Sequence, residues 1–404
     1  MKYIKIIFIN LLILLYSTET LLILFLPTPP VVTSEVIKER KIQAAIKKQL
    51  PYDTRTRKEV FISLKKENNN LMPVFNFAPP FRFSKIFQSS LKEKKLIPFR
   101  GPINSISLTC AEDLQYKTVK NDKYGFKNLN KVYKKKINTV LLGDSFAAGL
   151  CQDNENDITG NLISKGYNTV NLGVSGSSTL ISLAVISEFG KLFSPKNIVY
   201  SYYEGNDLEG LEWEKRIPVL MEYFNDENFN VDYINRYDEI KNFLDLIAKE
   251  SLEFIYKKEK LQISNQNNFK DGVIDFFELK KTKKIFRNNI LKKKDEDYDL
   301  DLLIKSIIKI KNKTHLLNSN FVFVYVPVSN RYIDKIDPYK GKKNYKESII
   351  KEMKKRKIKV IDLTRYLDSI QNPEKLYALG EFNGHFNAEG YKRISEIIIK
   401  ELKN

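Results

Sequence analysis

Five short apolar runs, separated by segments of helical periodicity, constrain the fold of this chain more than any other sequence feature. The runs are 139–142, 168–172, 197–203, 321–327 and 359–363. Continuous apolar runs of this length are typical of strands that are buried on both faces of a parallel sheet. Apolar residues recur at helical spacing over 180–191 and again over 391–402. The alternation predicts βαβ units with right-handed crossovers and a doubly wound parallel sheet.

The N-terminus predicts a membrane segment. Residues Ile6 to Leu26 form a 21-residue apolar stretch after Lys2 and Lys5, long enough to span roughly 30 Å. Glu19 is unusual there, because an acid at mid-membrane costs up to about 3 kcal/mol. We interpret residues 1–30 as an uncleaved signal anchor; a cleaved signal peptide is the alternative. Positive charge before the span predicts a single pass through the inner (cytoplasmic) membrane, with the catalytic domain extracytoplasmic.

The chain contains two cysteines, Cys110 and Cys151. In an extracytoplasmic compartment they are expected to pair, and the bridge would brace the loop that follows Ser145. Two buried free thiols are the alternative.

The charge of the chain carries little functional information. Lys and Arg number 68 against 49 Asp and Glu, which gives a net charge of +19. The excess is mostly lysine and lies among acids, without a nucleic-acid-binding motif, whereas phosphate recognition favours arginine. We therefore predict no nucleic-acid partner and interpret the basic runs as solvated surface.

The organisation predicted from these patterns has three parts. Residues 31–136 are polar and interrupted by Pro and Lys, and are expected to form a stalk and a wrapping segment. Residues 137–404 form the predicted α/β domain. Within this domain, 209–318 is a charged, mostly helical insertion whose role the sequence leaves open.

Four polar motifs lie at strand ends or at a helix entrance, where ligands bind in doubly wound folds. They are Gly143-Asp144-Ser145-Phe146, the Gly/Ser turn that contains Gly176, Glu204-Gly205-Asn206-Asp207, and Asn383-Gly384-His385-Phe386-Asn387. Each motif alone is weak, but the four in this order are a strong signal.

The chemistry of these residues is that of an esterase. A serine on a strand-to-helix turn exposes its hydroxyl, and His385 can take the proton of Ser145. The N–H groups of Ser145 and Gly176 and the amide of Asn206 are candidates for an oxyanion hole. Asp144 and Asn387 are weaker candidates for substrate binding.

These residues resemble the blocks of the SGNH/GDSL hydrolase superfamily, which supply Ser, Gly, Asn and His. Here they match Ser145, Gly176, Asn206 and His385, over about 137–207 and 320–404. The resemblance implies a flavodoxin-like three-layer α/β/α sandwich and ester hydrolysis or acyl transfer without metal or cofactor. Its membrane-anchored members include proteins that add or remove O-acetyl groups on exported polysaccharides.

One position departs from the family pattern. The family places an Asp two or three residues before the His, whereas this chain has Asn383 and Phe382 there, and the nearest acid is Glu381. Either Glu381 orients the imidazole, or a distant acid does, or Ser145 and His385 act as a dyad, or the site is a relic that only binds.

The sequence therefore predicts a serine esterase or O-acyltransferase that acts on ester groups, with acylated carbohydrate of the envelope or of an exported polysaccharide as substrate. Expected partners are the membrane, through the N-terminal helix, and envelope polysaccharide machinery. The alternative is a catalytically inactive protein of the same fold that binds or assembles polysaccharide.

Overall fold

The computed structural model describes residues 2–25, 39, 42–47, 49–73, 85–264, 276–280, 282–283, 298–335, 344–378 and 384–403. Contacts divide the chain into two compact units. One unit combines residues 1–39 with 257–297, and the other combines 40–256 with 298–404.

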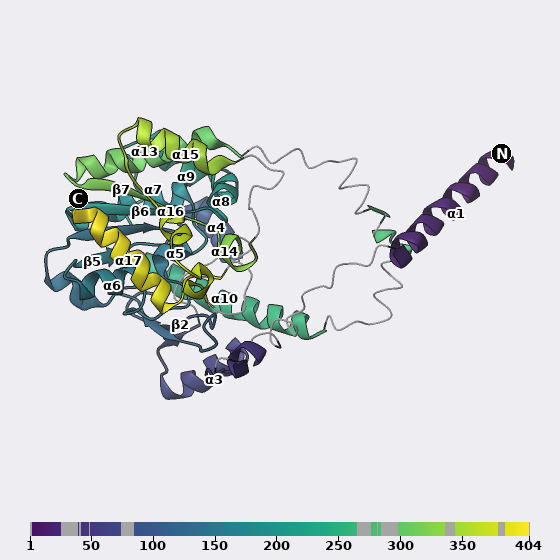
Figure 1. Cartoon of the computed structure of the whole chain (residues 1–404), viewed down its shortest axis with the longest axis horizontal. Coiled ribbons are helices and arrows are strands. Elements are labelled where there is room, and N and C mark those ends of the chain that lie inside the picture. The colour runs from purple at the N-terminus through teal and green to yellow at the C-terminus, as the bar shows by residue number, and fades with distance from the viewer. Residues whose placement is uncertain are drawn as a thin grey trace. The chain divides into compact units, whose positions relative to one another are not determined.

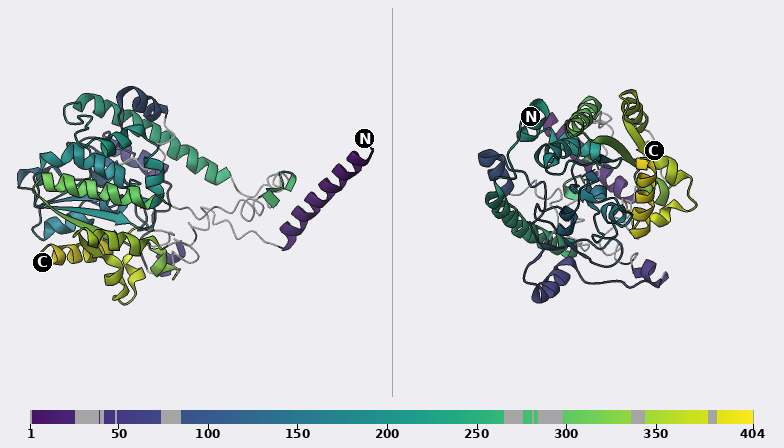
Figure 2. Two further views of the ribbon diagram at one scale, coloured as in Figure 1. Left: turned by 90° about the horizontal axis from the view of Figure 1, so that it is seen from above. Right: turned by 90° about the vertical axis from the view of Figure 1, so that its left-hand side faces the viewer.

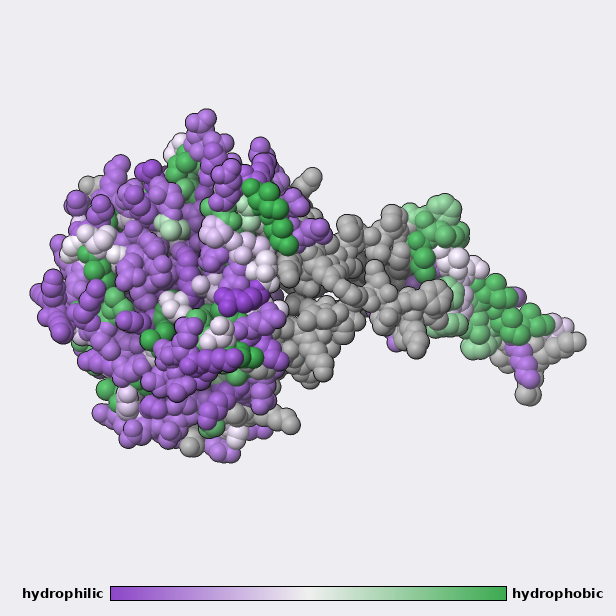
Figure 3. Space-filling view, turned by 90° about the horizontal axis from the view of Figure 1, so that it is seen from below, coloured by the Kyte–Doolittle hydropathy of each residue, from purple (hydrophilic) through white to green (hydrophobic). Residues whose placement is uncertain are grey.

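The smaller unit contains helix α1, Lys2–Phe25. Its segment Lys5–Phe25 has 21 residues and a mean hydropathy of 2.1, so its length and composition suit a membrane span. Most of its apolar side chains are exposed, and hydrophobic residues colour its surface in Figure 3.

The larger unit is built on a five-stranded parallel sheet. Its strands are β4 (Thr139–Gly143), β5 (Thr169–Asn171), β6 (Asn197–Tyr203), β7 (Asn320–Val326) and β8 (Lys359–Asp362). The spatial order is β5-β4-β6-β7-β8, which is the flavodoxin-like order 2-1-3-4-5. The predicted doubly wound parallel sheet is confirmed.

Helices cover both faces of this sheet, as Figures 1 and 2 show. One face packs against α7 (Thr179–Phe189), α13 (Leu300–Leu316) and α15 (Tyr345–Lys355). The other packs against α6 (Ile158–Ser164), α16 (Leu363–Asp368) and α17 (Ala388–Lys403). Adjacent strand residues such as Val140 and Leu141 point into opposite layers, and both are fully buried. This alternation explains why the strands are apolar throughout.

Short elements complete the layers at the ends of the strands. They are α5 (Ser145–Ala148), η3 (Gly190–Leu192), α14 (Asn330–Ile333) and η4 (Pro373–Leu376).

The segment before β4 packs partly into the same core, through residues between 87 and 137, and partly into a separate small cluster. Its elements are α3 (Arg57–Glu67), β1 (Leu71–Met72), α4 (Lys85–Lys94), β2 (Ile106–Leu108), β3 (Thr118–Lys120) and η2 (Asn130–Lys134). The strands β1-β2-β3 form a small separate sheet. Ile97 and Phe99 are buried in the main core, and the guanidinium of Arg100 lies over the rings of Phe189 and Tyr233. The wrapping part of residues 31–136 is thus tightly packed.

The region 209–318 is also largely built into the core. It contributes α9 (Pro218–Asn225), the first part of α10 (Tyr237–Ser264) and α13, and most of α8 (Asp207–Glu214). Leu220, Ile240 and Ile307 are fully buried in the core cluster that also contains residues of α7 and of the sheet. Only 257–297 falls in the smaller unit.

Candidate active site

The candidate site lies at the carboxyl edge of the sheet, where three neighbouring strands end. Ser145 follows β4, Gly176 follows β5 and Asn206 follows β6, and β4 is the middle strand of the three. The parallel sheet thereby brings the first three motifs to one edge, with the serine between the other two.

Ser145 lies on a tight strand-to-helix turn. Gly143 has a φ of +138°, and a Cβ at this position would lie 2.4 Å from the carbonyl oxygen of Ser201, so glycine is required. Asp144 caps α5 by accepting the N–H of Phe146 at 2.9 Å. Ser145 is 6% exposed. The turn holds its hydroxyl at the edge of the sheet.

His385 reaches this hydroxyl from the loop before α17. Its Nε2 lies 2.7 Å from Ser145 Oγ. Its ring centroid is 4.7 Å from that of Phe146, so the residue after the serine supports the imidazole. The backbone is held because the Ala378 N–H donates to the His385 carbonyl at 2.8 Å.

Glu112 completes the chain of hydrogen bonds, although it was not among the site residues predicted from the sequence. Its Oε1 lies 2.8 Å from His385 Nδ1, and its Oε2 accepts the His385 backbone N–H at 2.8 Å. With the proton on Nδ1, the ring donates to Glu112 while Nε2 accepts the Ser145 hydroxyl. Glu381, the acid suggested by sequence proximity, lies outside the described residues.

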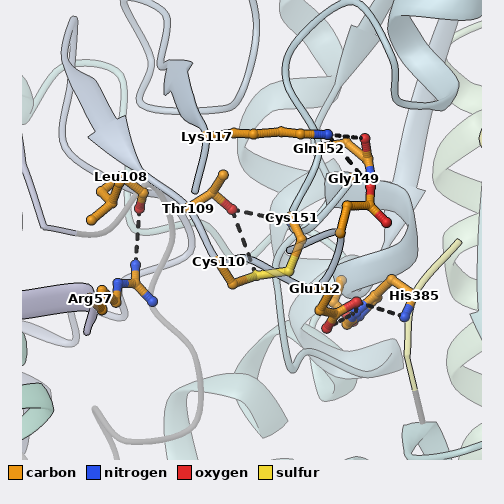
Figure 4. Close-up of a disulfide and its surroundings, with 12 residues drawn as sticks. Arg57, Leu108, Thr109, Cys110, Glu112, Lys117, Gly149, Cys151, Gln152 and His385 are labelled. Atoms are coloured by element: carbon orange, nitrogen blue, oxygen red, sulfur yellow. Dashed lines mark hydrogen bonds and ion pairs between the residues drawn. A yellow bond between two sulfur atoms is a disulfide. The ribbon is translucent and has the colours of Figure 1, made fainter. Parts of the chain in front are cut away.

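The Cys110–Cys151 disulfide joins the Glu112 loop to the loop that follows Ser145. The two sulfurs and a Glu112 carboxylate oxygen all lie within 4.8 Å of one another. Figure 4 shows the bridge beside the Glu112–His385 pair. The Cys151 N–H also donates to Thr109 Oγ1 at 3.2 Å. Because the sulfurs are bonded to each other, they are not available as thiolate ligands for a metal.

Polar side chains reinforce the same junction. Gln152 Nε2 donates to Asp113 Oδ2 at 2.5 Å, and Lys117 Nζ donates to Gln152 Oε1 at 2.8 Å. Asp113, which follows Glu112, is therefore hydrogen-bonded to Gln152, which follows Cys151.

The expected oxyanion donors lie on the flanking strand ends. Gly176 has a φ of +70°, a conformation that favours glycine. Asn206 immediately precedes α8 and is half-buried, and its Oδ1 has no hydrogen-bond partner among the described residues. No hydrogen bond to Oδ1 from the described residues therefore fixes the Asn206 side chain.

Two buried carboxyls lie behind the serine. Burial raises the pKa of Asp144 to about 6, although the Phe146 N–H and the nearby His385 oppose the shift. Burial, with Asp144 as a negative neighbour, also raises the pKa of Asp207. Asp144 Oδ2 lies 3.3 Å from Ser145 Oγ, so the closer His385 nitrogen at 2.7 Å is the favoured acceptor of the hydroxyl proton.

The two residues suggested for substrate binding, Asp144 and Asn387, both make capping contacts. Asp144 caps α5, as described above. Asn387 donates from Nδ2 to the Lys375 carbonyl at 2.7 Å and accepts the Gly390 N–H at 2.9 Å. Both side chains stabilise turns around the site.

Comparison with known proteins gives matches among solved structures only. No protein-family model and no curated protein matches the chain. A lipolytic protein of the G-D-S-L family from Desulfitobacterium hafniense is 15% identical, with 66% of this chain and 99% of that one covered and a TM-score of 0.34. A GDSL-like lipase from Bacteroides thetaiotaomicron is 11% identical, with 68% and 90% covered and a TM-score of 0.33. An acetyl xylan esterase is 13% identical, with 65% and 98% covered and a TM-score of 0.34.

Proposed function

We propose that this chain is a serine esterase or O-acyltransferase of SGNH type that acts through an acyl-enzyme. The observation that carries the proposal is the hydrogen-bonded series Ser145, His385 and Glu112, with heavy-atom distances of 2.7 and 2.8 Å. A nucleophile, a base and an orienting carboxylate in this order constitute a catalytic triad.

In the first half of the reaction, Ser145 Oγ attacks the carbonyl carbon of the ester and His385 Nε2 takes the hydroxyl proton. The oxyanion that forms is stabilised by the Ser145 and Gly176 N–H groups and by the Asn206 side-chain amide. The carbon–oxygen bond to the alcohol then breaks. His385 returns the proton to the leaving alkoxide, and the acyl group stays on Ser145.

In the second half, the acceptor is a water molecule or a sugar hydroxyl. His385 removes its proton, its oxygen attacks the acyl carbon, and Ser145 leaves with the proton returned by His385. Water yields hydrolysis and a sugar hydroxyl yields transfer, with the same residues in the same roles.

Glu112 has two functions in this scheme. Its carboxylate accepts from Nδ1 and so fixes the tautomer in which Nε2 is free to act as a base. It also places a negative charge beside the imidazolium that forms in each half-reaction. Its second bond, from the His385 backbone N–H, fixes the carboxylate relative to the ring.

We propose O-acyl groups of an envelope or exported polysaccharide as the substrate, and a site outside the cytoplasm. Two features support this location. One is the apolar helix α1, which carries Lys2 and Lys5 at its N-terminal end, and the other is a disulfide, which forms in oxidising compartments. The family resemblance supports the substrate class.

The test is acyl release from O-acylated envelope polysaccharide by the full-length protein in detergent. We expect acetate release by the wild type and none by Ser145→Ala, with an added sugar acceptor separating transfer from hydrolysis. Absence of both acyl release and acyl transfer with every envelope fraction, from protein shown to be folded, would contradict the proposal.

A further inference from the structure

Helix α1 contains a single buried side chain among the residues whose exposure is described, and that residue is an acid. Glu19 is 1% exposed, whereas only 6% of the apolar stretch within Lys5–Phe25 is buried. Glu19 lies six residues before Phe25, so it is about 9 Å along the axis from the end of the helix. A carboxyl at that depth in a membrane needs a partner, because lipid offers none.

The partner comes from the far side of the sequence. The Thr282 N–H donates to Glu19 Oε2 at 2.7 Å, across 263 residues of chain. One turn earlier on the same face, Tyr16 packs its ring 5.4 Å from Phe276 and donates its hydroxyl to the Phe277 carbonyl at 3.3 Å. Phe276, Phe277 and Thr282 thus contact α1 at two positions, three residues apart, on one helix face.

These contacts bear on whether α1 is removed. A signal peptide is cleaved early and has no use for a hydrogen-bond partner 263 residues downstream. A retained helix does, because a carboxyl within the span needs hydrogen-bond donors and lipid offers none. Phe277 is 64% exposed, and most apolar residues of α1 are exposed too. Exposed apolar side chains in both segments suit contact with lipid.

We infer that residues 276–283 bind the Tyr16–Glu19 face of α1 in the mature protein, and that α1 is therefore a retained anchor. The region 257–297 then has a specific role, which is to bind the anchor. The chain crosses between the two units near residues 39, 256 and 297. The first crossing connects the catalytic unit to α1 directly, and the other two connect it to the segment that binds α1.

The test is photo-cross-linking of the full-length protein in its native membrane. Tyr16→p-benzoylphenylalanine should cross-link to the tryptic peptide 271–280. Leu14→p-benzoylphenylalanine is the matched control, because Leu14 is about 200° away around the helix and 64% exposed. It should give no such product. Equal yields from the two positions, or a mature protein whose mass lacks the N-terminal helix, would overturn the inference.

A second pair of variants tests the role of Glu19 itself, independently of esterase activity. Glu19→Leu removes the acceptor and makes the span more apolar, so membrane insertion is retained while the cross-link from position 16 should fall at least about tenfold. Glu19→Gln keeps an acceptor oxygen and should retain the cross-link. An undiminished cross-link in Glu19→Leu would overturn recognition through this carboxyl.

Discussion

The Glu112 carboxylate binds His385, a residue 273 positions later in the chain, at two points: the ring nitrogen Nδ1 and the backbone N–H. No acid at the family's usual position, two or three residues before the histidine, is needed if this pair functions. The sequence departure that favoured an inactive binding protein therefore loses much of its weight.

The first prediction concerns the identity of the acid. Glu112→Gln removes the negative charge beside the imidazolium and permits the wrong tautomer, so we expect kcat to fall by about 10³–10⁴-fold. Glu381→Gln is the matched control, since it changes the acid nearest to the histidine in sequence. Steady-state hydrolysis of a small aryl ester measures both, and a larger loss in Glu381→Gln would reverse the assignment.

The second prediction concerns the disulfide as a positioning device. Cys110→Ala with Cys151→Ala frees the Glu112 loop from the loop after Ser145, and we expect kcat to fall by about 10–10²-fold as the acid loses its fixed position. The 41-residue separation also predicts a stability loss of about 4 kcal/mol in the loop-entropy model. Activity should be assayed well below the lowered Tm.

A double-mutant cycle separates positioning from stability. If the bridge acts through Glu112, removing both cysteines from the Glu112→Gln protein should cost almost no further activity. Additive losses at a temperature where every variant is folded would show that the bridge acts by another route.

The sequence predicted well those elements that a local sequence pattern specifies, and less well those that depend on tertiary contacts. The strand 197–203 was predicted with its observed limits, and the other four within one or two residues, because a buried parallel strand is an unbroken apolar run. The sheet then determined where the first three motifs lie. Ile97 and Phe99 were missed as core residues, since they lie in a short apolar run that Pro98 interrupts, without a periodic pattern.

Glu112 was missed for a different reason. Its approach to His385 depends on tertiary structure between β2 and β3, and nothing in the sequence near the histidine reports it. One signal was available: the predicted Cys110–Cys151 bridge would bring a residue two positions from Cys110 close to the loop after Ser145. Taking the two predictions together would have made Glu112 a candidate.

The third prediction concerns the oxyanion hole. Asn206→Ala removes one donor at the end of β6 and should lower kcat by about 10²–10³-fold with little change in KM, because the donor acts on charge that develops only in the transition state. Asn387→Ala removes an amide that caps α17 and should chiefly lower the Tm. Equal kcat losses in the two variants would contradict the distinction.

The fourth prediction follows from the buried Asp144. Its pKa of about 6, against an ordinary value of 3.8, means that the folded protein binds a proton between about pH 4 and 6 that the unfolded chain does not bind. The unfolding free energy contributed by this group is therefore highest near pH 4 and falls as the pH rises through 6, by about 3 kcal/mol.

Asp144→Asn keeps a capping side chain but cannot ionise, so it should raise the Tm relative to wild type at pH 8 and not at pH 4. Thermal unfolding of the two proteins at both pH values measures the difference. A Tm difference that does not change with pH would show that Asp144 is not a destabilising buried charge.

Labelling of the full-length protein with a fluorophosphonate shows whether Ser145 is an activated nucleophile. We predict rapid labelling of the wild type at Ser145, loss of labelling in Ser145→Ala and His385→Ala, and strongly slowed labelling in Glu112→Gln. A folded wild type that does not react, or equal labelling of Ser145→Ala, would contradict the account.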